Sequence, residues 1–320
     1  MAYRDHGPAG AAEVWLALHG GPGSGSSPGL LLAFDLKRQR VVVPDQRGSG
    51  SSLPRGCLRA NTLQHLVQDL ERLRQHLGVE RWHILGGSWG ATLALAYAQA
   101  HPHRVGRLVL RGSFDASPQT VRRLFHRHWA GKPVAGHSLD NRAMCQQLSQ
   151  LFHLGTLTVT QSGTLRRWEA METRAALAGA WRSVLHAGNP AERVAARQHW
   201  RQMHRYSRRL LSRPLPHLVG VQLRRKFRIQ AHYLARGCGL RPGNWSSWQR
   251  RLAQSGVRVD WVHGRHDPVC PPRVALEGHA RWGQHAAHGG LSRLHRVNGG
   301  HLGTDPAVLA ALRACVQRRP

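Results

Sequence analysis

The segment 86–90, Gly-Gly-Ser-Trp-Gly, constrains the fold of this 320-residue chain more than any other, because it joins two different periodic patterns. The short apolar run 82–85 before it predicts a buried strand, and residues 91–100 after it predict a helix. A serine on such a tight strand-to-helix turn needs small neighbours, which the glycines supply. The pattern G-x-S-x-G in this context predicts a nucleophile elbow that presents Ser88 at a helix N-terminus.

Short apolar runs alternate with helical patterns toward both ends of the chain. We expect strands at 14–18, 41–43, 82–85, 108–110, 257–262 and 294–297. Apolar residues at helical spacing predict a helix at 62–77, and the segment 305–317 predicts another. Strands that alternate with helices form mostly parallel sheets. The predicted fold class is therefore α/β, with a central sheet flanked by helices.

The middle of the chain has a different character. From 116 to 244 the strand patterns vanish, and helical stretches rich in Trp, Arg and Gln follow one another between glycine and proline breaks. Strand patterns resume at 257. The simplest architecture is a sheet domain interrupted by a helical cap. We expect the first part of the core at 1–115, the cap at 116–244 and the second part of the core at 245–320.

Cysteine, histidine and apolar content exclude several classes of protein. The five cysteines are widely spaced with no C-x-x-C, and none of the 23 histidines lies in H-E-x-x-H, so we expect neither a disulfide framework nor a metal site. No apolar stretch approaches the ~20 residues that span a bilayer, and no leader pattern opens the chain. We expect a cytoplasmic protein without membrane partners.

The formal charge of +30 raises polyanions as partners. All but three of the 46 basic residues are arginine, and they are dispersed along the chain instead of forming one run. This distribution is typical of a coding bias, so we expect no specific nucleic-acid partner. A noncatalytic polyanion-binding protein remains an alternative, because weak adhesion to polyanions at low salt follows from the charge alone.

Two further residues complete a candidate catalytic triad. In folds with this elbow the chain order is nucleophile, acid, histidine. Asp267 lies just past the predicted strand 257–262, and His301 follows the last predicted strand in Asn-Gly-Gly-His. Asp260 and Asp305 are rivals for the acid. Their places, within a strand and at the start of a helix, favour structural roles instead.

A second glycine-rich loop, His-Gly-Gly-Pro-Gly at 19–23, directly follows the first predicted strand. Such a loop can direct a backbone N–H at a substrate carbonyl, and we expect the N–H groups of Gly21 and Trp89 to form the oxyanion hole. A phosphate-binding loop is the alternative interpretation. No Lys-Ser/Thr follows, however, and Pro22 lacks an N–H.

With these motifs, the sequence resembles the proline iminopeptidase (prolyl aminopeptidase) family of α/β-hydrolases. The likeness runs through HGGPG at 19–23, DQRGSG at 45–50, GGSWGATLALAYAQAHP at 86–102, LRGSF at 110–114, GRHDPVCPP at 264–272 and GGH at 299–301. It implies an α/β-hydrolase fold with a helical cap and removal of N-terminal proline from peptides, without a metal or cofactor. The implied partner is a small peptide with a free N-terminus, and the oligomeric state is left open.

The resemblance also implies substrate-binding residues. Glu169, in a Trp-Glu pair, would bind the free amine, and Gln230 stands where the family has a second glutamate. Phe114 and Cys270 would line the pocket for the proline ring, with Leu234 where an aromatic residue is usual. Because an amide cannot balance an ammonium charge, the alternative is an esterase, amidase or lactonase that lost amine recognition.

Two smaller expectations follow from the same comparison of motifs. Only eighteen residues precede His19, so the antiparallel strands that open the family's sheet are expected to be at least partly missing. Cys270 lies three residues from Asp267. We therefore expect a bulky thiol reagent to slow turnover by crowding the site.

Overall fold

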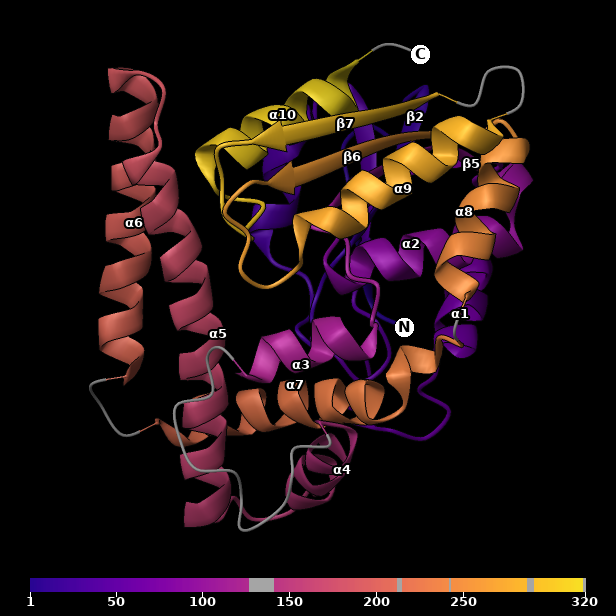
Figure 1. The fold of residues 1–320 in the computed structure, drawn as a ribbon. Helices are drawn as coiled ribbons and strands as arrows, with labels where there is room; N and C mark the ends of the chain where they lie inside the picture. Colours follow the sequence, from indigo (N-terminus) through magenta and orange to yellow (C-terminus); the bar gives the residue numbers. More distant parts are fainter. Residues whose placement is uncertain (127–140, 212–214, 242, 287–290, 319–320) are drawn as a thin grey trace.

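The computed structural model describes residues 1–126, 141–211, 215–241, 243–286 and 291–318. Within these ranges one sheet of seven strands forms in the order β1-β3-β2-β4-β5-β6-β7 (Figure 1). The strands are β1 (Tyr3–His6), β2 (Glu13–Leu18), β3 (Gln39–Pro44), β4 (Trp82–Gly87), β5 (Val105–Arg111), β6 (Arg258–Gly264) and β7 (Ser292–Val297). All neighbours pair in parallel except β1, which runs antiparallel to β3.

The six strands expected from apolar runs all form, and the α/β fold class with a mostly parallel sheet is confirmed. The edge strand β1 was not predicted. Its sequence, Tyr-Arg-Asp-His, is mostly exposed and has no apolar run, so nothing in its pattern indicates a strand. Backbone pairing of Tyr3 with Pro44 and of His6 with Val41 holds it in place. An antiparallel strand therefore does open the sheet, despite the short segment before His19.

Both faces of the sheet are covered, as parallel sheets require. In β2, Trp15 and Ala17 belong to one buried apolar cluster while Leu16 and Leu18 belong to the other. The larger cluster includes helices α1 (Leu63–His76), α2 (Trp89–Ala100), α8 (Asn244–Gln254) and α9 (Pro272–His285). The smaller cluster is closed by η1 (Pro28–Ala33) and α10 (Pro306–Gln317). The short η2 (Pro102–Arg104) links α2 to β5.

Helices intervene between β5 and β6, where the sequence predicts a cap. They are α3 (Pro118–His126), α4 (Asn141–Leu151), α5 (Val159–Leu185), α6 (Pro190–Leu211), α7 (His217–Ala235) and η3 (Gly237–Gly239). The long pair α5 and α6 lies side by side, and α4 packs against α7 (Figure 1). Residues 127–140 of the predicted cap lie outside the described residues, and its boundaries at 116 and 244 stay a prediction. Of the helices described, none is long and apolar enough to cross a membrane.

Parallel pairing places the carboxyl ends of β2, β4, β5, β6 and β7 at one edge of the sheet. The arrowheads of β6 and β7 point toward α5 at this edge (Figure 1). The loops that carry His19, Ser88, Asp267 and His301 each follow one of these strands. In open α/β sheets, ligands bind in the crevice outside the carboxyl ends of the strands. Sheet topology thus brings together segments that lie far apart in the sequence.

Candidate active site

Ser88 occupies a strained turn between β4 and α2. Its backbone has φ 56° and ψ −121°, a conformation that non-glycine residues rarely adopt. A Cβ on Gly86 would lie 2.3 Å from the carbonyl oxygen of Gly90, and one on Gly90 would lie 2.5 Å from the oxygen of Leu18. Neither position therefore tolerates a larger residue. Ser88 N–H donates to the carbonyl of Arg111 at 2.8 Å, which ties the turn to β5.

Asp267 and His301 are brought together from the loops after β6 and β7. His301 Nδ1 lies 2.8 Å from Asp267 Oδ2, while Asp267 Oδ1 accepts from the N–H groups of Val269 and Cys270 at 2.8 and 2.9 Å. Burial alone would raise the pKa of Asp267, but His301, His263 and the N–H of Cys270 together hold that pKa below its usual value. The carboxylate therefore stays ionised and fixes the tautomer in which Nδ1 carries the proton.

The two rival acids have other partners. Asp260 Oδ1 pairs with His295 Nε2 at 2.8 Å, on the strands β6 and β7. Asp305 precedes α10, and its Oδ2 accepts from Gly300 N–H at 3.0 Å, directly before His301. Asp305 thus supports the loop that carries the histidine, and neither rival contacts the imidazole of His301 in the hydrogen bonds found among the described residues. The geometry agrees with Asp267 as the acid partner.

The glycine loop after β2 lies against the nucleophile. A Cβ on Gly20 would lie 3.3 Å from Ser88 Cβ, and Gly21 has φ +117°, which a side chain would strain. Gln46, from the DQRGSG segment, links this loop to α2, because its Nε2 donates to His19 O at 2.9 Å and its Oε1 accepts from Trp89 Nε1 at 2.8 Å. Sequence reasoning missed this positioning role of Gln46.

Ser88 and His301 face one cavity of about 430 Å³ below the cap. Of the residues predicted for the site, Gly21, Phe114, Gln230 and Leu234 also line it. Glu169 and Cys270 are absent from the lining, and Asp267 and Trp89 lie behind it as buried residues. The cavity is therefore lined by the predicted nucleophile, the predicted base and three of the five predicted substrate contacts. The other two, Glu169 and Cys270, do not line it.

Three charged residues of the cavity region were not predicted. Arg111 is half-buried, lines the cavity and donates to the carbonyl oxygen of His301. Glu172 and Lys226 line its cap side. Lys226 Nζ lies 2.6 Å from Glu172 Oε2 and 3.0 Å from Glu169 Oε2. Glu172 follows Glu169 by almost one helical turn on α5, which is the signal that could have identified it.

Comparison with known proteins decides the family. The sequence matches the alpha/beta hydrolase fold family over residues 16–303. It is 32% identical over 303 residues to a proline iminopeptidase of Arabidopsis thaliana, covering 92% of this chain and 70% of that protein. A proline iminopeptidase of Xylella fastidiosa strain 9a5c is 31% identical over 277 residues, covering 83% and 77%. The chain belongs to the proline iminopeptidase family of α/β-hydrolases. It is therefore an enzyme, a hydrolase.

Solved structures agree with the fold of this proline iminopeptidase family member. An α/β-hydrolase from a Medee basin deep-sea metagenome library superposes with a TM-score of 0.65, at 14% identity over 100% of this chain and 94% of that one. An esterase from Exiguobacterium antarcticum gives a TM-score of 0.58, at 18% identity over 98% of this chain and 93% of that one. At these identities the likeness establishes the fold alone.

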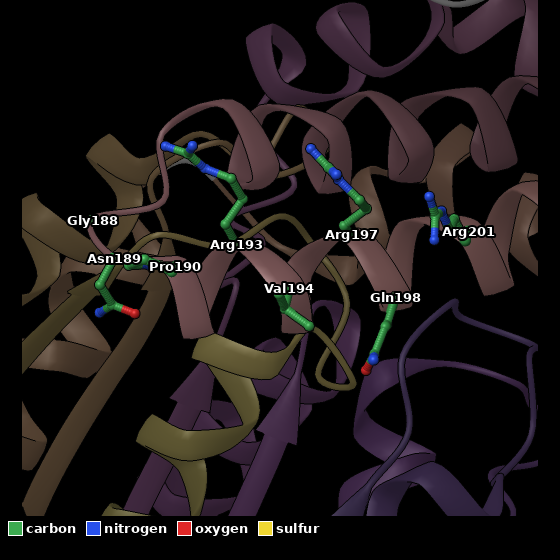
Figure 2. A pocket seen from close by; sticks show the side chains of 8 residues that line it. All are labelled: Gly188, Asn189, Pro190, Arg193, Val194, Arg197, Gln198 and Arg201. Atoms are coloured by element: carbon green, nitrogen blue, oxygen red, sulfur yellow. The ribbon is translucent and has the colours of Figure 1, made fainter.

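A second cavity, of about 450 Å³, lies along the start of α6 (Figure 2). Figure 2 shows Arg193 and Arg197 pointing to one side of the helix, with Val194 and Gln198 on the other. No serine, cysteine, histidine or acid is found among the residues lining it in the described structure. It therefore offers no nucleophile or base, and the hydrolase chemistry belongs to the cavity that contains Ser88.

Within the part of the chain that the structure describes, two clusters contain residue types that can bind metals: Asp267 with Cys270 and His301, and Asp260 with His295 and Cys315. A cysteine binds metal as the thiolate. Burial raises the pKa of the Cys270 thiol well above its usual value and that of Cys315 to about 12, so both stay protonated. A metal ion at either cluster would have to displace the thiol proton.

Burial also changes the prediction for Cys270. Its Sγ lies 3.9 Å from Ser88 Oγ, but the residue is 0% exposed and its thiol pKa is raised. We now expect a maleimide to modify the half-buried Cys57 in the native protein and to leave Cys270 unmodified until denaturant is added. Peptide mass spectrometry after a timed reaction measures both. Modification of Cys270 ahead of Cys57 under native conditions would contradict this expectation.

Proposed function

We propose that this enzyme is a serine aminopeptidase that releases N-terminal proline from peptides through an acyl-enzyme. The observation that carries the proposal is the arrangement around one cavity. Ser88 stands on a strained elbow at the head of α2, and His301, bonded through Nδ1 to the buried Asp267, faces the same space. The identity to proline iminopeptidases supports proline as the first residue of the substrate.

The proposed reaction follows from these positions. Ser88 Oγ attacks the carbonyl carbon of the first residue, and His301 Nε2 takes the hydroxyl proton, because Nδ1 is committed to Asp267. The N–H groups of Gly21 and Trp89 stabilise the developing oxyanion, each worth about 2.7–4 kcal/mol in the transition state. His301 then donates the proton to the leaving amine. Water enters and attacks the acyl carbon as His301 removes its proton, and His301 then returns the proton to Ser88 Oγ as the ester bond breaks and free proline leaves.

A second candidate function is favoured by the cap side of the cavity. The expected carboxylate at position 230 is a glutamine, and the carboxylates of Glu169 and Glu172 are already paired with Lys226. These contacts weaken the case for recognition of a free amine. The candidate is a serine hydrolase of the same chemistry that acts on acyl groups without a charged amine, as an esterase, amidase or lactonase does.

A substrate panel with Gln230→Glu tests the choice. Proline β-naphthylamide, its N-acetyl derivative and p-nitrophenyl acetate are compared in the natural protein and the variant. We expect turnover of the free prolyl substrate and a roughly 10- to 100-fold rise in its kcat/KM in Gln230→Glu, because a charge-assisted bond to the amine is worth about 1.5–3 kcal/mol. Turnover of the ester alone, in both proteins, would reject the aminopeptidase in favour of the second candidate.

The natural setting proposed for this reaction is the cytoplasm. The widely spaced cysteines, without a pattern typical of a secreted disulfide framework, support this location. The proposed partner is a short peptide, because the cavity of about 430 Å³ matches a small acyl group.

A further inference from the structure

Helix α5 of the cap packs its backbone directly against two loops of the core, the acid loop (residues 265–271) and the histidine loop (residues 298–305). A Cβ on Gly179, in the interior of α5, would lie 3.1 Å from Gly300 Cα and 3.1 Å from the carbonyl oxygen of His266. Gly300 directly precedes His301. His266 directly precedes Asp267. Glycine weakens a helix interior relative to alanine, and this close approach is what requires it here.

Asn298, at the start of the histidine loop, joins the same segments through its side-chain amide. Its Nδ2 donates to the carbonyl oxygen of Ser183 on α5 at 3.0 Å and to Glu192 Oε1 on α6 at 2.8 Å. Its Oδ1 lies 2.9 Å from His266 Nε2 in the acid loop. Because a carbonyl can only accept, the NH₂ group must face the cap, and Oδ1 must then accept from His266. One amide therefore ties both loops to two helices of the cap.

Backbone hydrogen bonds join the two loops as far as Gly299. The N–H of His266 donates to the carbonyl oxygen of Gly299 at 3.0 Å, and within the described residues no backbone hydrogen bond joins the loops beyond that point. Gly300 N–H instead donates to Asp305 Oδ2 at 3.0 Å. The path of the chain into His301 therefore depends on groups outside the acid loop, and the cap supplies some of them.

We propose that Asn298 is a positioning residue, which holds the acid loop and the histidine loop against the cap so that His301 Nδ1 meets Asp267 Oδ2 at 2.8 Å. Gly179 supports the same arrangement, because it lets α5 approach both loops. Asn298 itself does not line the cavity that contains Ser88, so it acts on the reaction through the other side chains. This inference rests on the serine hydrolase chemistry proposed above and gives the cap a role in catalysis besides covering the substrate.

Asn298→Ala removes all three hydrogen bonds of the amide. We expect kcat on p-nitrophenyl acetate to fall by about 10- to 100-fold with KM within about twofold, because a misplacement of about 1 Å can cost 100-fold in rate. The rate of fluorophosphonate labelling of Ser88 should fall by a similar factor. The NMR signal of the His301 Nδ1 proton, which a hydrogen bond to a carboxylate moves far downfield, should shift upfield or broaden.

Asn244→Ala is the matched control for this variant. Asn244 is also half-buried, and it begins α8. It does not line the cavity, and within the described part of the chain no hydrogen bond of its side chain is found. We expect its kcat, its labelling rate and the Nδ1 signal to stay at their natural values.

A second pair of variants, on one helix, keeps the test decisive if Asn298→Ala does not fold. Gly179→Ala places a Cβ against the two loops, whereas Gly163→Ala places one on α5 with nothing within 4 Å. Alanine favours a helix at both positions. We expect kcat and the labelling rate to fall about threefold to tenfold for Gly179→Ala alone, because its neighbours must shift by a few tenths of an ångström.

Thermal unfolding of each variant identifies a temperature at which all of them are folded, and the kinetics are measured there. Natural kcat and labelling rates in folded Asn298→Ala, or in Gly179→Ala where Asn298→Ala does not fold, overturn the positioning role. Lower activity with an unchanged Nδ1 signal overturns it as well. Failure of the folded natural protein to be labelled at Ser88 instead overturns the proposed serine hydrolase chemistry.

Discussion

Ser88→Ala is expected to lower kcat by a factor on the order of 10⁶, the largest effect of any single substitution in this protein. The reason is that no other hydroxyl stands on the strained turn between β4 and α2. Without Oγ the acyl-enzyme cannot form, and His301 has no proton to accept from a nucleophile. Steady-state rates on p-nitrophenyl acetate and on the prolyl substrate measure the loss. Covalent labelling by a fluorophosphonate, followed by intact mass, should disappear in the same variant.

A matched control for this result is Ser255→Ala. Ser255 is the C-cap residue that follows α8, where its Oγ donates to the carbonyl of Leu252, and it does not line the cavity. We expect labelling of this variant at the natural rate. If the natural protein is folded and a fluorophosphonate fails to label it, the alternative of a noncatalytic polyanion-binding protein gains support. Labelling that persists in Ser88→Ala would place the nucleophile elsewhere.

The sheet and the positions of the candidate triad residues at its carboxyl edge were predictable because their signals are local. Each parallel strand was predicted from a short apolar run, and each candidate catalytic residue lies in the loop that follows such a run. The carboxyl ends of parallel strands share one edge of the sheet. Ser88, Asp267 and His301 were therefore expected at the same edge. Strand β1 was not predictable on the same grounds. This strand forms because its backbone pairs with β3, and its polar sequence carries no pattern that indicates this pairing.

The cap side of the cavity could not be predicted for a different reason. The contacts of Lys226 with Glu169 and Glu172 join residues more than fifty positions apart on two helices, α5 and α7. Helical periodicity predicts that each helix forms, but it does not say which helices face each other. The sequence alone shows that Gln230 stands where a glutamate was expected. Only the packing of α5 against α7 shows that Lys226 contacts Glu172, the glutamate that Gln230 also contacts. The charged contacts on the cap side therefore belong to the least predictable part of the fold.

Asp267→Asn is expected to lower kcat by about 10⁴-fold while the protein remains folded. Asparagine has nearly the same shape, and its oxygen can still accept from the N–H groups of Val269 and Cys270. It cannot balance the positive charge that His301 acquires when it takes the proton of Ser88. Its NH₂ group, placed against Nδ1, would also favour the tautomer in which Nε2 carries the proton, and that tautomer cannot act as the base.

Asp260→Asn is the matched control for the choice of acid, because Asp260 lies on β6, the strand that leads to Asp267, and pairs with His295 instead of His301. We expect its kcat to stay within about threefold of the natural value, since buried Asp260 and half-buried His295 do not line the cavity that contains Ser88, and loss of their pairing affects stability more than chemistry. Thermal unfolding of both variants separates a loss of catalysis from a loss of fold. The carboxylate that stabilises the charged imidazole is the one whose removal slows the reaction. A large fall in kcat for Asp260→Asn, with little change for Asp267→Asn, would therefore identify Asp260 and not Asp267 as the acid.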